Sequence, residues 1–384
     1  MHMADALLSP AVGITMDAIS VAAIGISVSK VKKDEFSEKK IPIMGVAGAM
    51  VFAAQMINFA IPATGSSGHI GGGTLLAGLL GGVPAFLSVA AVLVIQCLFF
   101  ADGGLLALGA NIFNLGVIPC LIIYPLVFKP LLKSGIGYRR LTVASIISAV
   151  AGLELGAASV VIQTLLSGIT ELPFGVFASL MLPIHIAIGV VEGIVTAAVL
   201  SFVFKMRPEI IVSAQSGKSI GGDSAKKVVI ALAVLTVVIG GVFSLFASTN
   251  PDGLEWAIAK TGESGLEAKR EAQMEAEHGV GTEAETEAES GVGAEMEMEA
   301  EVEAEAEAEA EASIETKTTI IDAATEAQER VALLPDYSFQ SDPGNIAGTS
   351  VSGIVGSAIT FVLAGAAGLI ITVVKKRKKV GADA

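Results

Sequence analysis

The first residues of the chain, Met1-His2-Met3, place several nitrogen atoms where one metal ion could reach them. A histidine at position two offers the terminal amine, its own backbone amide after deprotonation, and an imidazole nitrogen, which together close fused chelate rings. Planar nitrogen donors suit Ni(II) or Cu(II), and Co(II) can adapt to them, whereas Mg²⁺ and Ca²⁺ prefer oxygen. Because a bulky second residue generally blocks removal of the initiator methionine, we expect Met1 to remain. The N-terminus is therefore a candidate chelate that lacks a fourth ligand.

His69 is the candidate for that fourth ligand. It lies in Gly65-Ser-Ser-Gly-His-Ile-Gly-Gly-Gly73, where glycines on both sides permit backbone conformations that bring a segment close to an ion or to the N-terminal strand. Each histidine also has an ordinary interpretation, His2 as a disordered terminal residue and His69 as a loop histidine with its own hydrogen bonds. The metal hypothesis therefore requires that the two residues meet.

Five further polar residues could support a ligand or line an ion pathway: Asp5, Asp102, Asn111, His185 and Glu192. His185 and Glu192 are seven residues apart in an apolar segment, so they share one face of a helix. The pair could relay protons or metal, or simply tie two helices together. Asp102 and Asn111 could orient an imidazole, but helix capping by Asp102 and helix–helix hydrogen bonding by Asn111 fit equally well.

The composition places these residues in a membrane protein. Of 384 residues, 53% are hydrophobic and 16% are charged, and the mean hydropathy is +0.71, which is too apolar for an ordinary soluble domain. The net charge of −14 is concentrated, because most carboxylates lie between Glu255 and Glu329. Cys97 and Cys120 both lie in apolar runs without CxxC spacing, so we expect them to act as small buried hydrophobic residues.

Apolar runs of about 20 residues, the length that crosses a bilayer, predict an all-α integral membrane protein, a polytopic bundle of about nine transmembrane helices. The expected spans are 9–29, 41–61, 73–82, 84–101, 104–128, 141–166, 177–204, 228–247 and 351–374. The third is short and could merge with the fourth across Gly81-Gly-Val-Pro84, which would leave eight. The loops between the spans contain clusters of lysine and arginine, which normally lie on the cytoplasmic side. All of these clusters lie on that side only if the third and fourth spans are separate helices. This choice puts the N-terminus outside and the C-terminus inside.

The same topology brings the candidate ligands to one face of the membrane. Residues 1–8, the loop 62–72 and the Asp102-Gly-Gly104 turn all fall outside. Met1, His2 and His69 therefore share a compartment, a placement that follows from the charges of the loops and not from the chemistry of these residues.

A second unit follows residues 1–205 after a cytoplasmic linker at 206–227. Residues 228–384 contain two of the spans and are interrupted at about 263–330 by an acidic insertion, which we expect to be disordered because its Glu-rich alternation repels itself and lacks large apolar side chains. The insertion could concentrate cations near the entrance or be only a solvated spacer. Ser216-Gly-Lys-Ser219 lacks the first glycine and the strand of a P-loop, so we expect no ATPase site and no enzymatic activity.

The residues described above resemble those of the CbiM/NikM family, the substrate-binding membrane subunits of energy-coupling-factor transporters for cobalt and nickel. That family opens with a Met-His-Ile-Pro-Asp-Gly-like segment ending in Leu-Ser-Pro, and the matching residues here are Met1, His2, Asp5, Leu8, Ser9 and Pro10. The chain departs at Ala4 and Ala6, where proline and glycine are usual. The departures could alter how rigidly the segment is held without removing a donor atom.

The resemblance extends over residues 1–205 through dispersed motifs. Further matches are the Gly68-His69 loop, Phe100-Ala-Asp-Gly-Gly104, Leu108-Gly-Ala-Asn111 and the stretch from His185 to Gly193. Pro251-Asp-Gly-Leu-Glu255 resembles the small outer domain of PDGLE type that some members carry as a fusion, more often in nickel systems. This feature favours nickel only slightly, so the sequence does not decide between nickel and cobalt.

The resemblance implies a mechanism that the residues alone do not. Met1, His2 and His69 would form a near-planar four-nitrogen site for nickel or cobalt, bound as substrate, with no cofactor. The partners would be a transmembrane coupling subunit and cytoplasmic ABC ATPases, without nucleic acid, in a multi-pass protein of the cell membrane. The alternative is an ion-coupled secondary metal transporter, which would show internal repeats and carboxylates at mid-membrane. Only Glu154 and Glu192 qualify as such carboxylates, and no repeat is evident.

Overall fold

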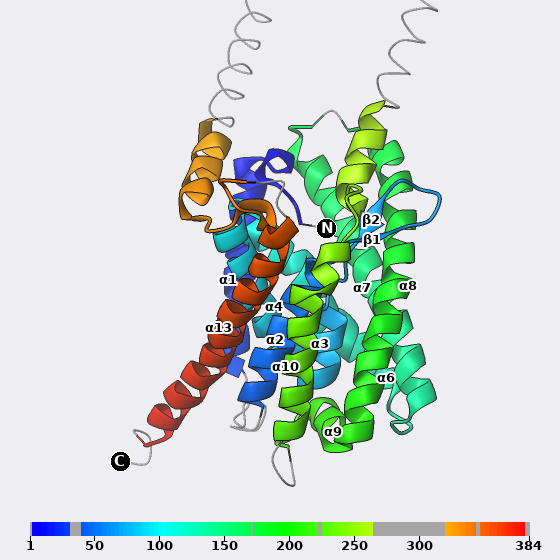
Figure 1. Cartoon of the computed structure of the whole chain (residues 1–384), viewed down its shortest axis with the longest axis vertical. Coiled ribbons are helices and arrows are strands. Elements are labelled where there is room, and N and C mark those ends of the chain that lie inside the picture. The colour runs from blue at the N-terminus through cyan, green and yellow to red at the C-terminus, as the bar shows by residue number, and fades with distance from the viewer. Residues whose placement is uncertain are drawn as a thin grey trace, which may run out of the picture.

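The computed structural model describes residues 2–30, 40–170, 172–220, 225–263, 319–342 and 346–380. These form a helical bundle with a small two-stranded hairpin at one end (Figure 1). The helices of the first unit are α1 (Pro10–Lys30), α2 (Ile41–Gln55), α3 (Gly73–Leu80), α4 (Gly82–Phe100), α5 (Leu108–Ile112), η3 (Phe113–Phe128), α6 (Lys129–Leu131), α7 (Tyr138–Ser167), α8 (Phe174–Met206) and α9 (Pro208–Ser216). The second unit contributes α10 (Lys226–Gly241), η4 (Phe243–Phe246), η5 (Pro335–Tyr337), α13 (Ile346–Val380) and helical turns over 253–263 and 319–331.

Seven helices in the described ranges are long and apolar enough to cross a membrane. The sequence predicts about nine spans, and α2 and α3 account for the difference, because they have only 15 and eight residues. At about 1.5 Å per residue, neither reaches across the roughly 30 Å of a bilayer core. Each of the nine expected segments does contain a helix. The chain is a multi-pass membrane protein, while the count of nine is not confirmed and its orientation stays a prediction.

The break between α3 and α4 falls where the sequence places it. Gly81 joins the two helices with φ of +90°, a conformation that favours glycine. Its backbone also packs against the end of α9, so a Cβ at Gly81 would lie 3.3 Å from the Ala214 carbonyl oxygen. Pro84 then occupies the first turn of α4, where its missing N–H costs no helical hydrogen bond. The two helices are therefore separate, as expected.

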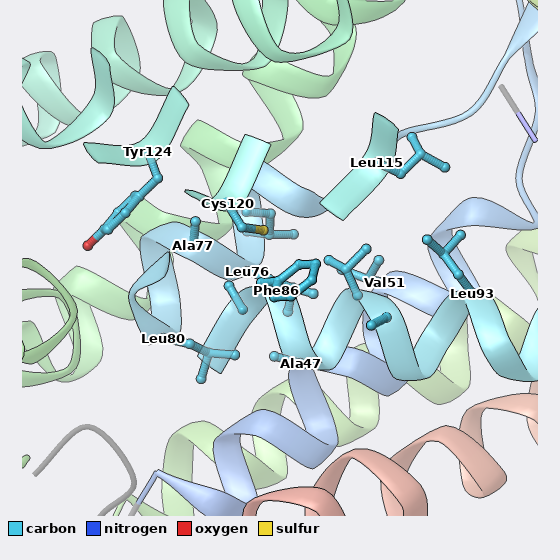
Figure 2. Packing of buried hydrophobic residues seen from close by; sticks show 14 of the residues in the cluster. Ala47, Val51, Leu76, Ala77, Leu80, Phe86, Leu93, Leu115, Cys120 and Tyr124 are labelled. Atoms are coloured by element: carbon cyan, nitrogen blue, oxygen red, sulfur yellow. The ribbon is translucent and has the colours of Figure 1, made fainter. Parts of the chain in front are cut away.

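The core lies where α2, α3, α4 and η3 meet. Figure 2 shows buried side chains from these four helices interdigitating, among them Ala47, Val51, Leu76, Leu80, Phe86, Cys120 and Tyr124. Cys97 and Cys120 are both buried free thiols, which confirms the prediction for them. The η3 segment has π-helical geometry and contains Pro119 and Pro125, whose lack of an N–H disfavours regular α-helical bonding.

The second unit packs directly on the first. The helices α10 and α13 lie beside α2 (Figure 1) and cross each other at Gly240 and Gly353, where a Cβ on Gly353 would lie 2.2 Å from the Gly240 carbonyl oxygen. Small residues of this kind allow close helix packing in membranes. The expected linker 206–227 contains α9, whose Ile211 is fully buried. Within the expected insertion, residues 319–331 are helical, and 264–318 lie outside the described residues.

One end of the bundle gathers the segments that bear the candidate ligands. The N-terminal segment, the hairpin of β1 (Phe59–Ala60) and β2 (Ser67–Gly68), and residues 319–342 all lie at this end, whereas α9 lies at the opposite end (Figure 1). The hairpin is antiparallel, with Phe59 opposite Gly68 and Ala60 opposite Ser67. His2, His69 and Asp102 therefore lie at one end of the bundle, as predicted, and the side of the membrane that this end faces stays a prediction.

Candidate metal site

Asn111 in α5 holds the N-terminal segment in place. The Met3 N–H donates to Asn111 Oδ1 at 2.7 Å, and Asn111 Nδ2 donates back to the Met3 carbonyl at 3.1 Å. The Gly104 N–H donates to the same carbonyl at 2.9 Å. The asparagine side chain thus pairs with the Met3 backbone as a neighbouring strand would, and it fixes the position of the preceding residue, His2.

Asp5 makes a second tie between the N-terminus and the turn before α5. Its Oδ1 accepts a hydrogen bond of 2.9 Å from the Ala107 N–H, and its side chain is buried. Burial raises the pKa of Asp5, whereas the backbone N–H groups of residues 105–107 lower it. Asp5 and Asn111 therefore both position the N-terminal segment, which is the supporting role that the sequence suggested for them.

His2 and His69 lie face to face. Their ring centroids are 5.1 Å apart and the rings are inclined by 17°. On the far side of His2, its Nδ1 faces Asp102 Oδ1 at 3.3 Å, while its Nε2 is buried without a hydrogen-bond partner among the described atoms. The structure thus brings together the two histidines that the sequence predicts as ligands, one from the N-terminus and one from the loop 62–72. Asp102 lies beside His2.

The orientation of the His69 ring fixes which nitrogen it can offer. His69 Nδ1 is 3.1 Å from the Ile70 carbonyl oxygen, which can only accept, so Nδ1 carries the hydrogen. Nε2 then holds the lone pair of the neutral ring, an arrangement that is usual for metal-binding histidines. Nε2 is directed toward Asp252 Oδ2, at 3.8 Å.

Burial keeps both imidazoles neutral. It lowers the pKa of His2 and lowers the pKa of His69 to about 3, and the neutral ring is the form that binds metals. In the described part of the chain, no three His, Cys, Asp or Glu side chains are arranged as a ligand set. The ligand set predicted from the sequence adds main-chain donors of the N-terminus to His2 and His69. Met1, which was predicted to supply one, lies outside the described residues.

Glu192 holds the glycine-rich loop that carries His69. Its carboxylate, buried in the middle of α8, accepts hydrogen bonds from the Gly71 N–H at 2.6 Å and the Gly72 N–H at 3.2 Å. Gln55 at the end of α2 donates to the Gly71 carbonyl at 2.9 Å. The prediction that Glu192 and His185 share a helix face is confirmed, but Glu192 bonds the loop and not His185.

His185 is buried in α8. Its Nδ1 lies 2.7 Å from the Met181 carbonyl one turn earlier in α8. A small cavity is lined by both His69 and His185. His185 does not touch His2, so the structure places it near the candidate ligands without bringing it among them.

Sequence reasoning missed Asp252 and Tyr337, both from the second unit. Asp252 faces His69, as described above, and the Tyr337 hydroxyl donates a hydrogen bond to Asp102 Oδ2. Gln328 also donates to the Gly103 carbonyl at 2.6 Å. The Asp-x-x-Glu spacing at 252–255 is a capping-box signal that could have located Asp252 at a helix start. No sequence signal shows which loop that helix start meets.

A cavity of about 660 Å³ opens above the two histidines. Its lining comes from both units and includes seven carboxylates: Asp5, Asp102, Asp252, Glu255, Asp322, Glu329 and Asp336. No lysine or arginine is among the lining residues in the described part of the chain. Clefts lined by charge of one sign raise the local concentration of the opposite charge, so this cavity attracts cations.

Two protein-family models match this chain, one over each unit. The model of the family described as cobalt uptake substrate-specific transmembrane region, CbiM, matches residues 2–210. The chain belongs to the CbiM family. The PDGLE domain model matches residues 226–287 and 293–373, so this CbiM chain carries a fused PDGLE domain, as the motif resemblance predicted.

Relatives of this CbiM chain are described as metal transport proteins. The putative fused nickel transport protein NikMN of Archaeoglobus fulgidus is 32% identical over 273 residues, which cover 68% of this chain and 83% of the relative. A putative metal transport protein of Haloquadratum walsbyi is 32% identical over 225 residues, covering 58% of this chain and 99% of the relative. A solved structure of a truncated transition metal transporter has a TM-score of 0.48 and 30% identity, and the match covers 54% of this chain and 99% of that one.

Proposed function

We propose that this chain captures a divalent transition-metal ion, nickel or cobalt, on the outer face of the cell membrane and is the metal-binding subunit of an importer. The observation that carries the proposal is the pair of buried, neutral imidazoles of His2 and His69, stacked at the base of a carboxylate-lined cavity. Membership of the CbiM family and the nickel and cobalt transport names of its relatives support it.

The proposed ligands are four nitrogens: the Met1 amine, the His2 backbone amide, one His2 imidazole nitrogen and His69 Nε2. Only Nδ1 of His2 can close a six-membered ring with the amide of the same residue. This nitrogen faces Asp102, so a bound ion would displace the hydrogen that Asp102 now attracts. Because Tyr337 also bonds Asp102, the carboxylate keeps a partner when it gives up His2.

We propose that transport energy comes from partner proteins, a transmembrane coupling subunit and cytoplasmic ABC ATPases, by resemblance to the family. The alternative, an ion-coupled secondary transporter, needs membrane carboxylates that are available to bind and release an ion. Glu192 is engaged with the backbone of the His69 loop. This engagement disfavours it as the carboxylate of a secondary carrier.

Metal titration of the purified full chain in detergent tests the proposal. The wild type is expected to bind one Ni(II) or Co(II), and His2→Ala, His69→Ala and a form with one extra residue before Met1 are each expected to lose most of that affinity. His278→Ala, outside the described residues and in the acidic stretch, is the matched control and should bind as the wild type does. Equal binding by the extended form would exclude the N-terminal chelate. Parallel titrations with the two metals decide between nickel and cobalt.

A further inference from the structure

The sequence Pro251-Asp-Gly-Leu-Glu255 forms a clasp on the hairpin that precedes His69. The Ser67 N–H and Oγ both donate to the Pro251 carbonyl, at 2.8 and 3.1 Å, and Ser67 Oγ also reaches the Asn250 carbonyl at 2.8 Å. Trp256 Nε1 donates to the Thr64 carbonyl at 3.0 Å. The fused unit is thus hydrogen-bonded to the same loop that carries a candidate metal ligand.

The clasp divides the two oxygens of Asp252 between two tasks. Oδ1 accepts hydrogen bonds from the Leu254 and Glu255 N–H groups, at 2.8 and 2.9 Å, and so caps the helix over 253–263. Glu255 completes the capping box by accepting from the Asp252 N–H at 3.1 Å. With Oδ1 committed to the cap, the direction of Oδ2 is set by the helix, and it faces His69.

The spacing between Asp252 Oδ2 and His69 Nε2 suits a bound ion. The 3.8 Å between them is too long for a hydrogen bond. It is slightly less than the sum of typical metal–nitrogen and metal–oxygen bonds, about 2.0–2.1 Å and about 2.0–2.2 Å for a first-row divalent ion such as zinc. That sum applies to donors on opposite sides of an ion, and in the four-nitrogen set the side opposite His69 belongs to the His2 amide. An oxygen that binds above the nitrogen plane would lie about 3 Å from His69 Nε2, so Asp252 Oδ2 must approach by about 1 Å to touch the same ion.

We propose that Asp252 is a ligand of the captured metal ion, so that the fused unit supplies an anionic oxygen to an ion held through nitrogen by the first unit. This assignment rests on the proposed metal-capture function.

Packing around the clasp prevents Asp252 from moving away from His69. A Cβ on Gly253 would lie 3.0 Å from Ile188 Cδ1 and 3.2 Å from His185 Cε1, so the backbone beside Asp252 rests directly on α8. Leu254 is 2% exposed and belongs to the main core. Every residue of the motif thus has a contact that fixes Asp252 against His69.

An oxygen ligand from Asp252 would affect the preference of the site for nickel or cobalt. Square-planar nitrogen sites suit Ni(II), whereas an added carboxylate oxygen raises the coordination number and favours an ion that accepts mixed nitrogen and oxygen donors. Co(II) is such an ion. Removing the Asp252 charge is therefore expected to weaken cobalt binding more than nickel binding.

Asp252→Asn in the full chain tests the assignment. Asparagine caps helices as well as aspartate does, so the clasp should stay while the charge is lost. The matched control is Glu255→Gln, which removes a charge from the same cavity and keeps the capping box. We expect Asp252→Asn to lower Co(II) affinity by about tenfold or more, to lower Ni(II) affinity less, and to shift the visible d–d bands of the cobalt-loaded protein, with neither band shift nor affinity loss of that size in the control.

Three results would overturn the assignment: unchanged affinity in Asp252→Asn, equal losses in both variants, or a loss of affinity with unshifted cobalt bands. The last two would mean that the charge acts only through the field of the cavity. Failure of the proposed function itself looks different, because the wild type would then bind neither Ni(II) nor Co(II) at one equivalent.

Discussion

At the scale of single residues, the protonation of the two histidines determines how metal binding depends on pH. Burial places the pKa of His69 at about 3 and lowers that of His2, so His69 holds no extra proton between pH 5 and 8. If the Met1 amine and the His2 amide complete the site, they alone must release protons. An α-amine has a pKa of about 7.7–8.0, so nearly two protons should leave per ion at pH 7.

This proton count is measurable by calorimetric titration of nickel into the protein in buffers with different heats of ionisation. Apparent affinity should rise with pH, by about 100-fold per unit below pH 7 and about tenfold per unit above the pKa of the amine. Release of no protons would mean that side chains alone hold the ion. A form extended before Met1 serves as the control and should show a smaller release.

Asn111 offers a second test at this scale, because the chain contains a matched asparagine. Asn111 pairs with the Met3 backbone, whereas Asn114 pairs with Gln163 through bonds of 3.0 and 3.1 Å and has only a 3.8 Å contact to the Met3 sulfur. Asn111→Ala should weaken nickel binding by about tenfold or more, as loss of an orienting group does. Asn114→Ala should lower the melting temperature and leave nickel affinity within about twofold of wild type; equal affinity losses in both would contradict the positioning role.

At the scale of elements, α8 controls the loop that carries His69. Glu192→Gln would turn an amide NH₂ toward backbone N–H groups that now donate to a carboxylate, and it would leave at least one buried donor unsatisfied. We expect faster hydrogen exchange at Gly71 and Gly72 and nickel affinity lower by about tenfold. Glu154→Gln in α7, a second carboxylate within an expected span, is the control and should change neither; protection of both glycines in Glu192→Gln would refute the coupling.

The elements also show what sequence patterns can and cannot supply. Apolar run length located a helix in each of the nine expected spans, and glycine placed the α3–α4 break, because both signals are local. It did not locate α9 or the helical residues 253–263 and 319–331, which are shorter or more polar. The length of α3 was harder to judge, since Gly72 and Gly81 end the helix after eight residues within a longer apolar run. Asp252 was missed because its partner, His69, lies far away in sequence. Its local capping signal predicts a helix start but not the loop on which that helix rests.

At the scale of the whole molecule, the two units together build the cavity through which an ion approaches. The second unit contributes Asp322, Glu329 and Asp336 to its lining, and the first contributes the histidines at its base. Fields in a cleft of one charge sign speed association of the opposite charge and are weakened by salt. The fused unit is therefore expected to act on the rate of capture as well as on the strength of binding.

Neutralising the carboxylates that the second unit adds to the cavity separates the rate of capture from the strength of binding. A triple variant, Asp322→Asn, Glu329→Gln and Asp336→Asn, should slow nickel association by about tenfold at low ionic strength and flatten its salt dependence, with an unchanged dissociation rate because none of the three contacts His2 or His69. The control is Glu326→Gln on the same helix, whose carboxylate pairs with Arg330 at 2.6 Å and is absent from the cavity lining. Stopped-flow measurements in detergent at several salt concentrations give both rates. A faster dissociation in the triple variant would show that these carboxylates hold the ion, and an equal slowing in Glu326→Gln would show that overall charge, not the cavity, guides it.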